Sequence, residues 1–178
     1  MKDIIIVLDP GHGGRDPGAV CKGIYEKDLN LKITAKLYIL LKNQGITVKM
    51  TRTDDRYLLL SDRVIMANKL KADIFISIHC NAAGSSRAKG IETLYYPGST
   101  NGKALAEKIQ FHLIDKLKRI DRGIKSRSDL FVLKYTSMPA VLIECGFLSN
   151  REEMELLTDD NYRDNIAAAI LEGIGDYF

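Results

Sequence analysis

The sequence is poor in cysteine, in long hydrophobic runs and in net charge, and each shortage argues against a class of protein. Its three cysteines are an odd number at irregular spacing, without a Cys-x-x-Cys pair. This argues against a disulfide framework and against a cysteine-rich zinc site. No apolar run reaches the length of about eighteen residues that a transmembrane helix needs. The net charge of +3 is spread along the chain and gives little support for a nucleic-acid partner.

Length and composition predict a single domain. The 178 residues, 46% of them hydrophobic, can bury one sizeable core. No linker divides the chain, so we expect one domain over residues 1–178. Met1, Lys2 and Asp3 lead directly into an apolar run instead of a signal-peptide segment. The chain as written is expected to be soluble, either complete or as a part cut from a longer secreted protein.

Three apolar runs each lead to a side chain that can carry chemistry. The runs are residues 4–8, 74–78 and 140–143, and they lead to His12 in a Gly-rich loop, to His79 and to Glu144. Short β-branched runs of this kind are typical of strands buried on both faces of a sheet. If the three strands are parallel neighbours, then His12, His79 and Glu144 meet at one rim, where open α/β folds place their sites.

Helical spacing between these runs predicts an α/β fold. Apolar residues recur at helical intervals over residues 28–44, with Gly45 as the stop, over residues 102–120 and over residues 162–174. Ser61 is expected to cap a helix that runs to about residue 71, and Asn150 with Glu153 a short helix. Further strands are expected at residues 46–50, 90–96 and 130–133. The sequence therefore predicts one mostly parallel central sheet with helices on both faces.

His12, His79 and Glu26 together have the composition of a catalytic metal site. Two imidazoles and a carboxylate are the protein ligands of a catalytic zinc ion, which leaves a fourth position for water. Glycines on both sides clear space around His12. Each residue also has a purely structural interpretation: a loop hydrogen bond for His12, core-edge packing for His79, and a favourable charge at a helix start for Glu26. A non-haem iron oxygenase would use the same ligand types.

Glu144 is expected to act as a base. It ends an apolar strand, so desolvation would raise its pKa toward the range that suits proton transfer. This extra carboxylate favours hydrolysis over oxygen chemistry. The alternative is that Glu144 forms an ion pair with Arg52 or Arg63.

A thiol mechanism is the less favoured hypothesis. Cys80 follows His79 and Cys145 follows Glu144, and successive strand residues point to opposite faces. Both cysteines are therefore expected to be buried and inert. Cys21 lacks a basic neighbour that would make it a thiolate, and the segment GHGGRDPG lacks the ending of a P-loop.

The chain resembles the zinc-dependent N-acetylmuramoyl-L-alanine amidases found in bacterial cell-wall autolysins, sporulation amidases and phage endolysins. The match runs from Ile4 nearly to Phe178. The residues that carry it are, in chain order, 9–14, Glu26, Thr51 with Arg52, Arg63, Ala67 with Asn68, 72–79, Asn81, 90–92, 138–144 and 146–150.

The resemblance implies a complete set of site residues. Carried over by position, it places the ligands of one zinc ion on His12, Glu26 and His79 and the catalytic glutamate on Glu144. The implied reaction is hydrolysis of the amide between N-acetylmuramic acid and the L-alanine of the stem peptide, with peptidoglycan as partner and neither nucleic acid nor membrane insertion. We expect a monomer that acts at the bacterial cell wall, as an excised catalytic domain or a phage-type enzyme.

Two other functions stay open at this point. A non-catalytic wall-binding domain could use the same rim, but it would not need Glu144. A zinc peptidase would cut within the stem peptide and free a different amine.

Overall fold

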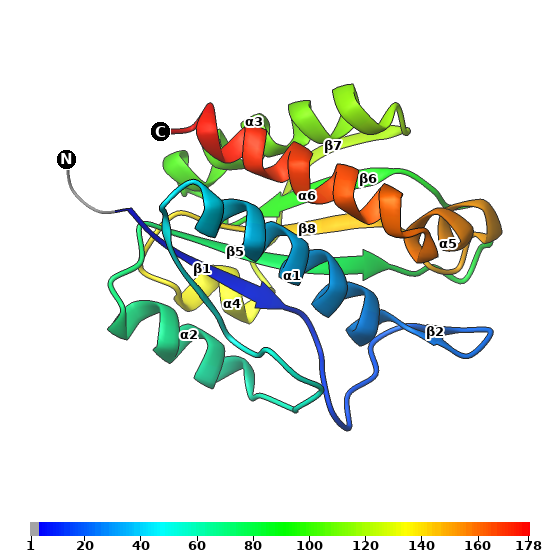
Figure 1. Cartoon of the computed structure of the whole chain (residues 1–178), viewed down its shortest axis with the longest axis horizontal. Helices are drawn as coiled ribbons and strands as arrows, with labels where there is room; N and C mark the ends of the chain where they lie inside the picture. The colour runs from blue at the N-terminus through cyan, green and yellow to red at the C-terminus, as the bar shows by residue number, and fades with distance from the viewer. Residues whose placement is uncertain (1–3) are drawn as a thin grey trace.

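Six strands form one mostly parallel sheet in this computed structural model, which describes residues 4–178 (Figure 1). In sheet order the strands are β4 (Thr47–Met50), β1 (Ile5–Pro10), β5 (Ile74–Asn81), β8 (Ala140–Phe147), β6 (Ile91–Tyr95) and β7 (Asp121–Ser126). β4, β1, β5 and β8 are parallel neighbours, whereas β6 is antiparallel to β8 and parallel to β7. The predicted neighbourhood of the three apolar strands is confirmed.

Helices cover both faces of this sheet, as predicted. On one side, here called the three-helix face, lie α1 (Glu26–Asn43), α3 (Thr100–Leu117) and α6 (Asp160–Gly175). On the other side, the two-helix face, lie α2 (Leu60–Lys69) and α4 (Phe131–Tyr135). A small hairpin of β2 (Val20–Cys21) and β3 (Ile24–Tyr25) precedes α1, and α5 (Arg151–Thr158) precedes α6. Figure 1 shows α1 and α6 crossing in front of the strands.

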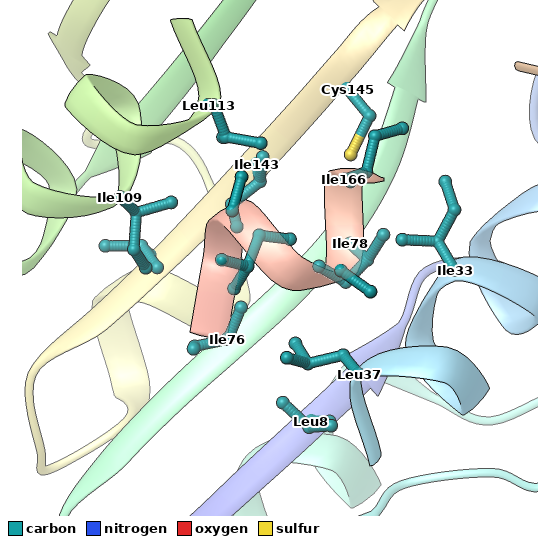
Figure 2. Close-up of a cluster of buried hydrophobic side chains, with 14 of the residues drawn as sticks. Leu8, Ile33, Leu37, Ile76, Ile78, Ile109, Leu113, Ile143, Cys145 and Ile166 are labelled. Carbon is teal, nitrogen blue, oxygen red and sulfur yellow. The ribbon is translucent and has the colours of Figure 1, made fainter. Parts of the chain in front are cut away.

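The main hydrophobic core lies on the three-helix face. Every second residue of the central strands points to this side, because side chains alternate along a strand. Figure 2 shows these strand residues meeting side chains from all three helices. The labelled core residues are Leu8, Ile76, Ile78, Ile143 and Cys145 from the strands, Ile33 and Leu37 from α1, Ile109 and Leu113 from α3, and Ile166 from α6.

The two-helix face is apolar along the first half of the strands and polar beyond it. Val7, Phe75 and Leu142 pack in a second cluster with residues of α2 and α4. The next positions on the same side of these strands are Asp9, Ser77 and Glu144. The change from apolar to polar residues occurs at the carboxyl ends of the strands, which is the end where the loops after β1 and β5 emerge.

Three local predictions are wrong. Ser61 does not cap α2, because the N-cap is Leu59, which makes no side-chain cap bond. Residues 130–133 are not a strand: Leu130 is the N-cap of the short helix α4. The strand β7 was not predicted, since Asp121, Arg122 and Gly123 interrupt any apolar alternation at this sheet edge.

Other local predictions are confirmed. Asn150 accepts a hydrogen bond from the backbone N–H of Glu153 and caps α5, and Gly45 has a left-handed φ of 75° after α1. The expectation for Met1, Lys2 and Asp3 lies outside the described residues. Within residues 4–178, none of the helices combines the length and the apolarity that crossing a membrane requires.

Candidate metal centre and its acid–base neighbour

Three structural elements bring the predicted ligands together at one rim of the sheet. His12 lies in the loop after β1 with a left-handed φ of 61°, and His79 lies near the carboxyl end of β5. Glu26 is the first residue of α1, so it belongs to the helix and not to the loop before it. The hairpin of β2 and β3 folds the intervening chain back toward β1, and the backbone N–H of Glu26 donates to the carbonyl of Ala19 at 2.9 Å.

Glu26 bridges the two histidines. Its Oε2 lies 3.2 Å from Nε2 of His12, and its Oε1 lies 2.9 Å from Nδ1 of His79. One atom from each of the three residues lies within 4.8 Å of the others. Ligand atoms around a tetrahedral zinc ion are about 3.4 Å apart at ordinary bond lengths. The donor set and its spacing therefore fit a zinc ion.

The surrounding backbone leaves room for this cluster. A Cβ atom at Gly11 would lie 2.2 Å from Nε2 of His79, and one at Gly18 would lie 2.5 Å from Oε2 of Glu26. Gly18 also has a φ of 65°, which side-chain-bearing residues rarely adopt. Both glycines are needed because the rings and the carboxylate occupy the space that a side chain would fill.

Further hydrogen bonds fix the orientation of the ligands. Nδ1 of His12 lies 2.8 Å from Oδ2 of Asp16, an arrangement that leaves Nε2 to face the cluster. Glu26 accepts backbone N–H groups from Ala19 at 2.8 Å and Cys80 at 3.1 Å. These contacts orient the His12 ring and the Glu26 carboxylate toward the cluster.

The charges in the cluster favour a cation. Burial lowers the pKa of His12, but hydrogen bonds and charges from Glu26 and Asp16 outweigh it and raise the pKa to about 9. For Glu26, burial raises the pKa, and hydrogen bonds from His12 and His79 outweigh it and hold the pKa well below its usual range. The cluster therefore favours the ionised form of Glu26, and this negative charge is what a metal ligand has to supply.

Glu144 lies beside the cluster and not within it. It is the direct partner of His79 in the pairing of β5 with β8. Its Oε2 is shielded from solvent and has no hydrogen-bond partner among the described residues. Burial raises the pKa of Glu144 to about 7, with smaller contributions of opposite sign from the charges of His79 and Glu26. A carboxyl group with this pKa can both accept and donate a proton near neutral pH.

The alternative partners of Glu144 are engaged elsewhere. Arg63 donates to Oδ1 of Asp9 at 2.7 Å and to the carbonyl of His12 at 2.8 Å. Arg52 donates to the carbonyls of Pro10 at 3.0 Å and Gly11 at 2.9 Å. The predicted alternative of an ion pair between Glu144 and one of these arginines is therefore wrong for the described structure.

The two arginines instead stabilise the loop that carries His12. Both are almost fully buried, and they satisfy backbone carbonyls that a left-handed turn leaves without strand partners. Sequence reasoning from the residues alone did not assign them this role. The available signal was their place in the resemblance, together with the difficulty of burying an arginine without several acceptors.

The remaining polar candidates lie away from the rim or face the core. Cys80 and Cys145 are 1% exposed on the three-helix face, and burial raises the pKa of both thiols. The prediction that they are buried is confirmed. Cys21 is half-buried. His112 lies on α3 with Nε2 2.9 Å from Asp176 of the C-terminal segment, far from the cluster in the fold.

A groove of about 370 Å³ opens beside the cluster on the two-helix face. His12 and His79 form part of its wall. The other walls are largely apolar and come from the segment before α2 and from the start of α4: Tyr57, Leu58, Leu60, Leu130, Phe131 and Val132. Two of the three candidate ligands, His12 and His79, therefore line a cleft that a larger molecule can enter.

Comparison with known proteins places the chain among cell-wall amidases. The family described as N-acetylmuramoyl-L-alanine amidase matches residues 6–176. The chain is 42% identical over 179 residues to the endolysin of Bacillus phage SPP1, covering 97% of this chain and 65% of that protein. It is 39% identical over 175 residues to the N-acetylmuramoyl-L-alanine amidase LytC of Bacillus subtilis, covering 97% of this chain but 35% of LytC.

A solved structure agrees with this placement. The crystal structure of an N-acetylmuramoyl-L-alanine amidase from Clostridium difficile 630 superposes with a TM-score of 0.96 at 42% identity, covering 99% of this chain and 97% of that one. The similarity therefore extends over the whole sheet and its helices, including the rim that holds the histidines.

Proposed function

The chain belongs to the N-acetylmuramoyl-L-alanine amidase family, and we propose that it hydrolyses the amide between the lactyl group of N-acetylmuramic acid and the L-alanine of the stem peptide. One observation carries the proposal: the buried Oε2 of Glu144 has no hydrogen-bond partner within residues 4–178. Glu144 is also the strand partner of His79, which belongs to the cluster of two histidines and a carboxylate. A zinc hydrolase of the proposed kind uses both a metal site and a separate base, whereas a metal-binding domain without activity does not need the base.

His12, Glu26 and His79 would hold one zinc ion. When bound, zinc supplies a Lewis acid that polarises the scissile carbonyl and lowers the pKa of water. Asp16 keeps the His12 ring turned so that Nε2 faces the site. Glu26 is held by the backbone N–H groups of Ala19 and Cys80, which fix the direction of its carboxylate.

Glu144 is the proton carrier in this proposal. Its carboxylate accepts a proton from the attacking water as the new C–O bond forms at the carbonyl carbon. The same group then donates that proton to the amide nitrogen, and the C–N bond breaks to give a lactyl carboxylate and the free amine of L-alanine. A raised pKa suits both halves of this exchange, and a non-covalent route requires no nucleophilic side chain.

The proposed site of action follows from this activity. Peptidoglycan lies outside the cytoplasmic membrane, so we propose that the chain acts at the bacterial cell wall as a monomeric catalytic domain comprising residues 1–178. It would do so either as part of a longer secreted protein or as a phage-type enzyme, in line with the longer relatives that it matches only in part.

The decisive experiment identifies the bond that is cut. Purified peptidoglycan is incubated with the zinc-loaded protein, and the newly exposed amino termini are labelled and identified. N-terminal L-alanine alone supports the proposal. Release of an internal stem-peptide residue would show a peptidase instead, and an absence of new amines with zinc bound would indicate a non-catalytic binding domain.

A further inference from the structure

A pair of cations shares a single carboxylate beside Glu144. Lys125 and Arg122 both donate to Oε2 of Glu92, at 2.5 and 2.6 Å. The other oxygen of Glu92 receives a long hydrogen bond of 3.4 Å from the side chain of Asn81. Among the three side chains Glu92, Arg122 and Lys125, one negative charge faces two positive charges, so this trio has one positive charge in excess.

Within residues 4–178, the acceptors around Lys125 and Arg122 are fewer than the N–H groups that these two side chains can donate. The side chain of Glu92 is 9% exposed, whereas that of Lys125 is 42% exposed. An ammonium has three N–H donors, and Glu92 is the acceptor that the described structure provides for Lys125. The guanidinium of Arg122 is more confined, because it stacks over the ring of Phe147 at 4.8 Å and also donates to the carbonyl of Lys89 at 3.4 Å.

The sheet brings this pair next to the reactive groups. Glu92 on β6 is the direct antiparallel partner of Glu144 on β8, so both carboxylates lie on the same face of the sheet. Lys125 pairs with Leu94 on that same face, which is the two-helix face. The next cation along the chain, Arg127, does not add to the excess, because Asp129 neutralises it through two bonds of 2.8 and 2.6 Å.

The order of strands places a cationic surface on one side of the candidate metal cluster and an apolar surface on the other. His79 and Glu144 lie on the central strands β5 and β8, the cation pair lies on the β6–β7 side, and the apolar groove is built around His12, α2 and α4. The proposed substrate has the same asymmetry. Its muramoyl side has no free carboxylate, because the carboxyl group of the lactyl substituent forms the amide with L-alanine. Its stem peptide, in contrast, carries free carboxylates.

We propose that Lys125 and Arg122, held in place by Glu92, bind a carboxylate of the stem peptide and so position the peptide side of the scissile amide toward β7. The inference rests on the proposed function and adds the residues that select for an anionic peptide. Lys125 is the main positioning residue because its ammonium is both the more exposed and the less saturated of the two groups. A charge-assisted contact of this kind corresponds to about a tenfold effect on kcat/KM.

The test compares two forms of one substrate. Purified peptidoglycan is divided, and in one portion the peptide carboxylates are converted to carboxamides. The release of N-terminal alanine is then measured for the unaltered protein and for Lys125→Met, which keeps the apolar stem but removes the charge. The unaltered protein should act about tenfold more slowly on the amidated portion. Lys125→Met should be slowed on the untreated portion by a similar factor and barely changed on the amidated one.

Two further variants separate charge from structure. Lys125→Arg should restore the preference for the untreated portion, because it restores the cation. Lys103→Met removes another exposed lysine, on α3, and should keep both rates. Equal rates of the unaltered protein on the two portions, or an equal loss on both portions for Lys125→Met, would overturn the inference while leaving the amidase proposal intact. If neither the untreated nor the amidated portion released N-terminal alanine, both the inference and the amidase proposal would be overturned.

Discussion

The two faces of the central sheet are built from the same strands, but one is packed as the main core and the other carries the candidate reactive groups. On the three-helix face, Ile76, Ile78 and Ile143 are fully buried beneath α1, α3 and α6. On the two-helix face, the alternate positions are apolar only until the strands approach their carboxyl ends. At these carboxyl ends, His79 follows Ile78 in the sequence and Glu144 follows Ile143, and the two residues are paired across the strands.

This difference separates stability from chemistry within single strands. Truncating a residue on the three-helix face removes buried apolar surface, and each Å² lost lowers the free energy of unfolding by about 25 cal/mol. A residue on the rim of the two-helix face contributes hydrogen bonds or charge, and Glu144 leaves an oxygen unsatisfied, which is typical of functional groups that do not improve stability. Adjacent substitutions should therefore have different consequences.

The largest effect is expected at the metal cluster. His12→Ala or His79→Ala removes one of three ligands, so bound zinc and alanine release should both fall to near background. Bound zinc is measured by metal analysis of dialysed protein, and circular dichroism checks that the fold persists. Full zinc occupancy in both variants would remove these histidines from the ligand set.

Glu144→Gln should be nearly as damaging to turnover without affecting the metal. The amide keeps the shape of the side chain but cannot accept a proton from water, so kcat should fall by roughly 10²–10⁴. Zinc content and Tm should barely change, because neither Arg52 nor Arg63 depends on this carboxylate in the described structure. A stable, zinc-loaded variant with nearly unchanged turnover would contradict the catalytic role.

Ile76→Ala tests the opposite face of the strand that carries His79. Ile76 is 0% exposed within the main core, so its truncation should lower the free energy of unfolding by about 2–5 kcal/mol. Denaturant titration measures the loss. Zinc content and turnover per folded molecule should stay near those of the unaltered protein, and a selective loss of turnover in fully folded protein would show that the two faces are not separable.

The smallest effect is expected at the buried cysteines. Cys80→Ser and Cys145→Ser each place a hydroxyl in the main core, at a cost of about 1–3 kcal/mol if it finds no partner. Turnover of the folded fraction should remain, since both thiols face away from the rim. Complete inactivity of a folded, zinc-loaded serine variant would restore the thiol mechanism as a hypothesis.

The prediction of the fold succeeded where the signal was local. Short β-branched runs, helical spacing and the cap at Asn150 each act over a few residues, and the structure agrees with them. The prediction failed where local preference was weak. The edge strand β7 is polar, and the five residues of α4 are too few to show helical spacing.

Strand alternation and the apolar runs, which are visible in the sequence, place His79 and Glu144 on one face of the sheet and Cys80 and Cys145 on the other. The contacts that these residues make depend on the folded arrangement of the whole chain. Glu26 reaches His79 across 53 positions of the chain, Arg63 reaches Asp9 across 54, and Lys125 reaches Glu92 across 33. Such contacts depend on strand order and side-chain packing across the sheet, and no local pattern of residues specifies them.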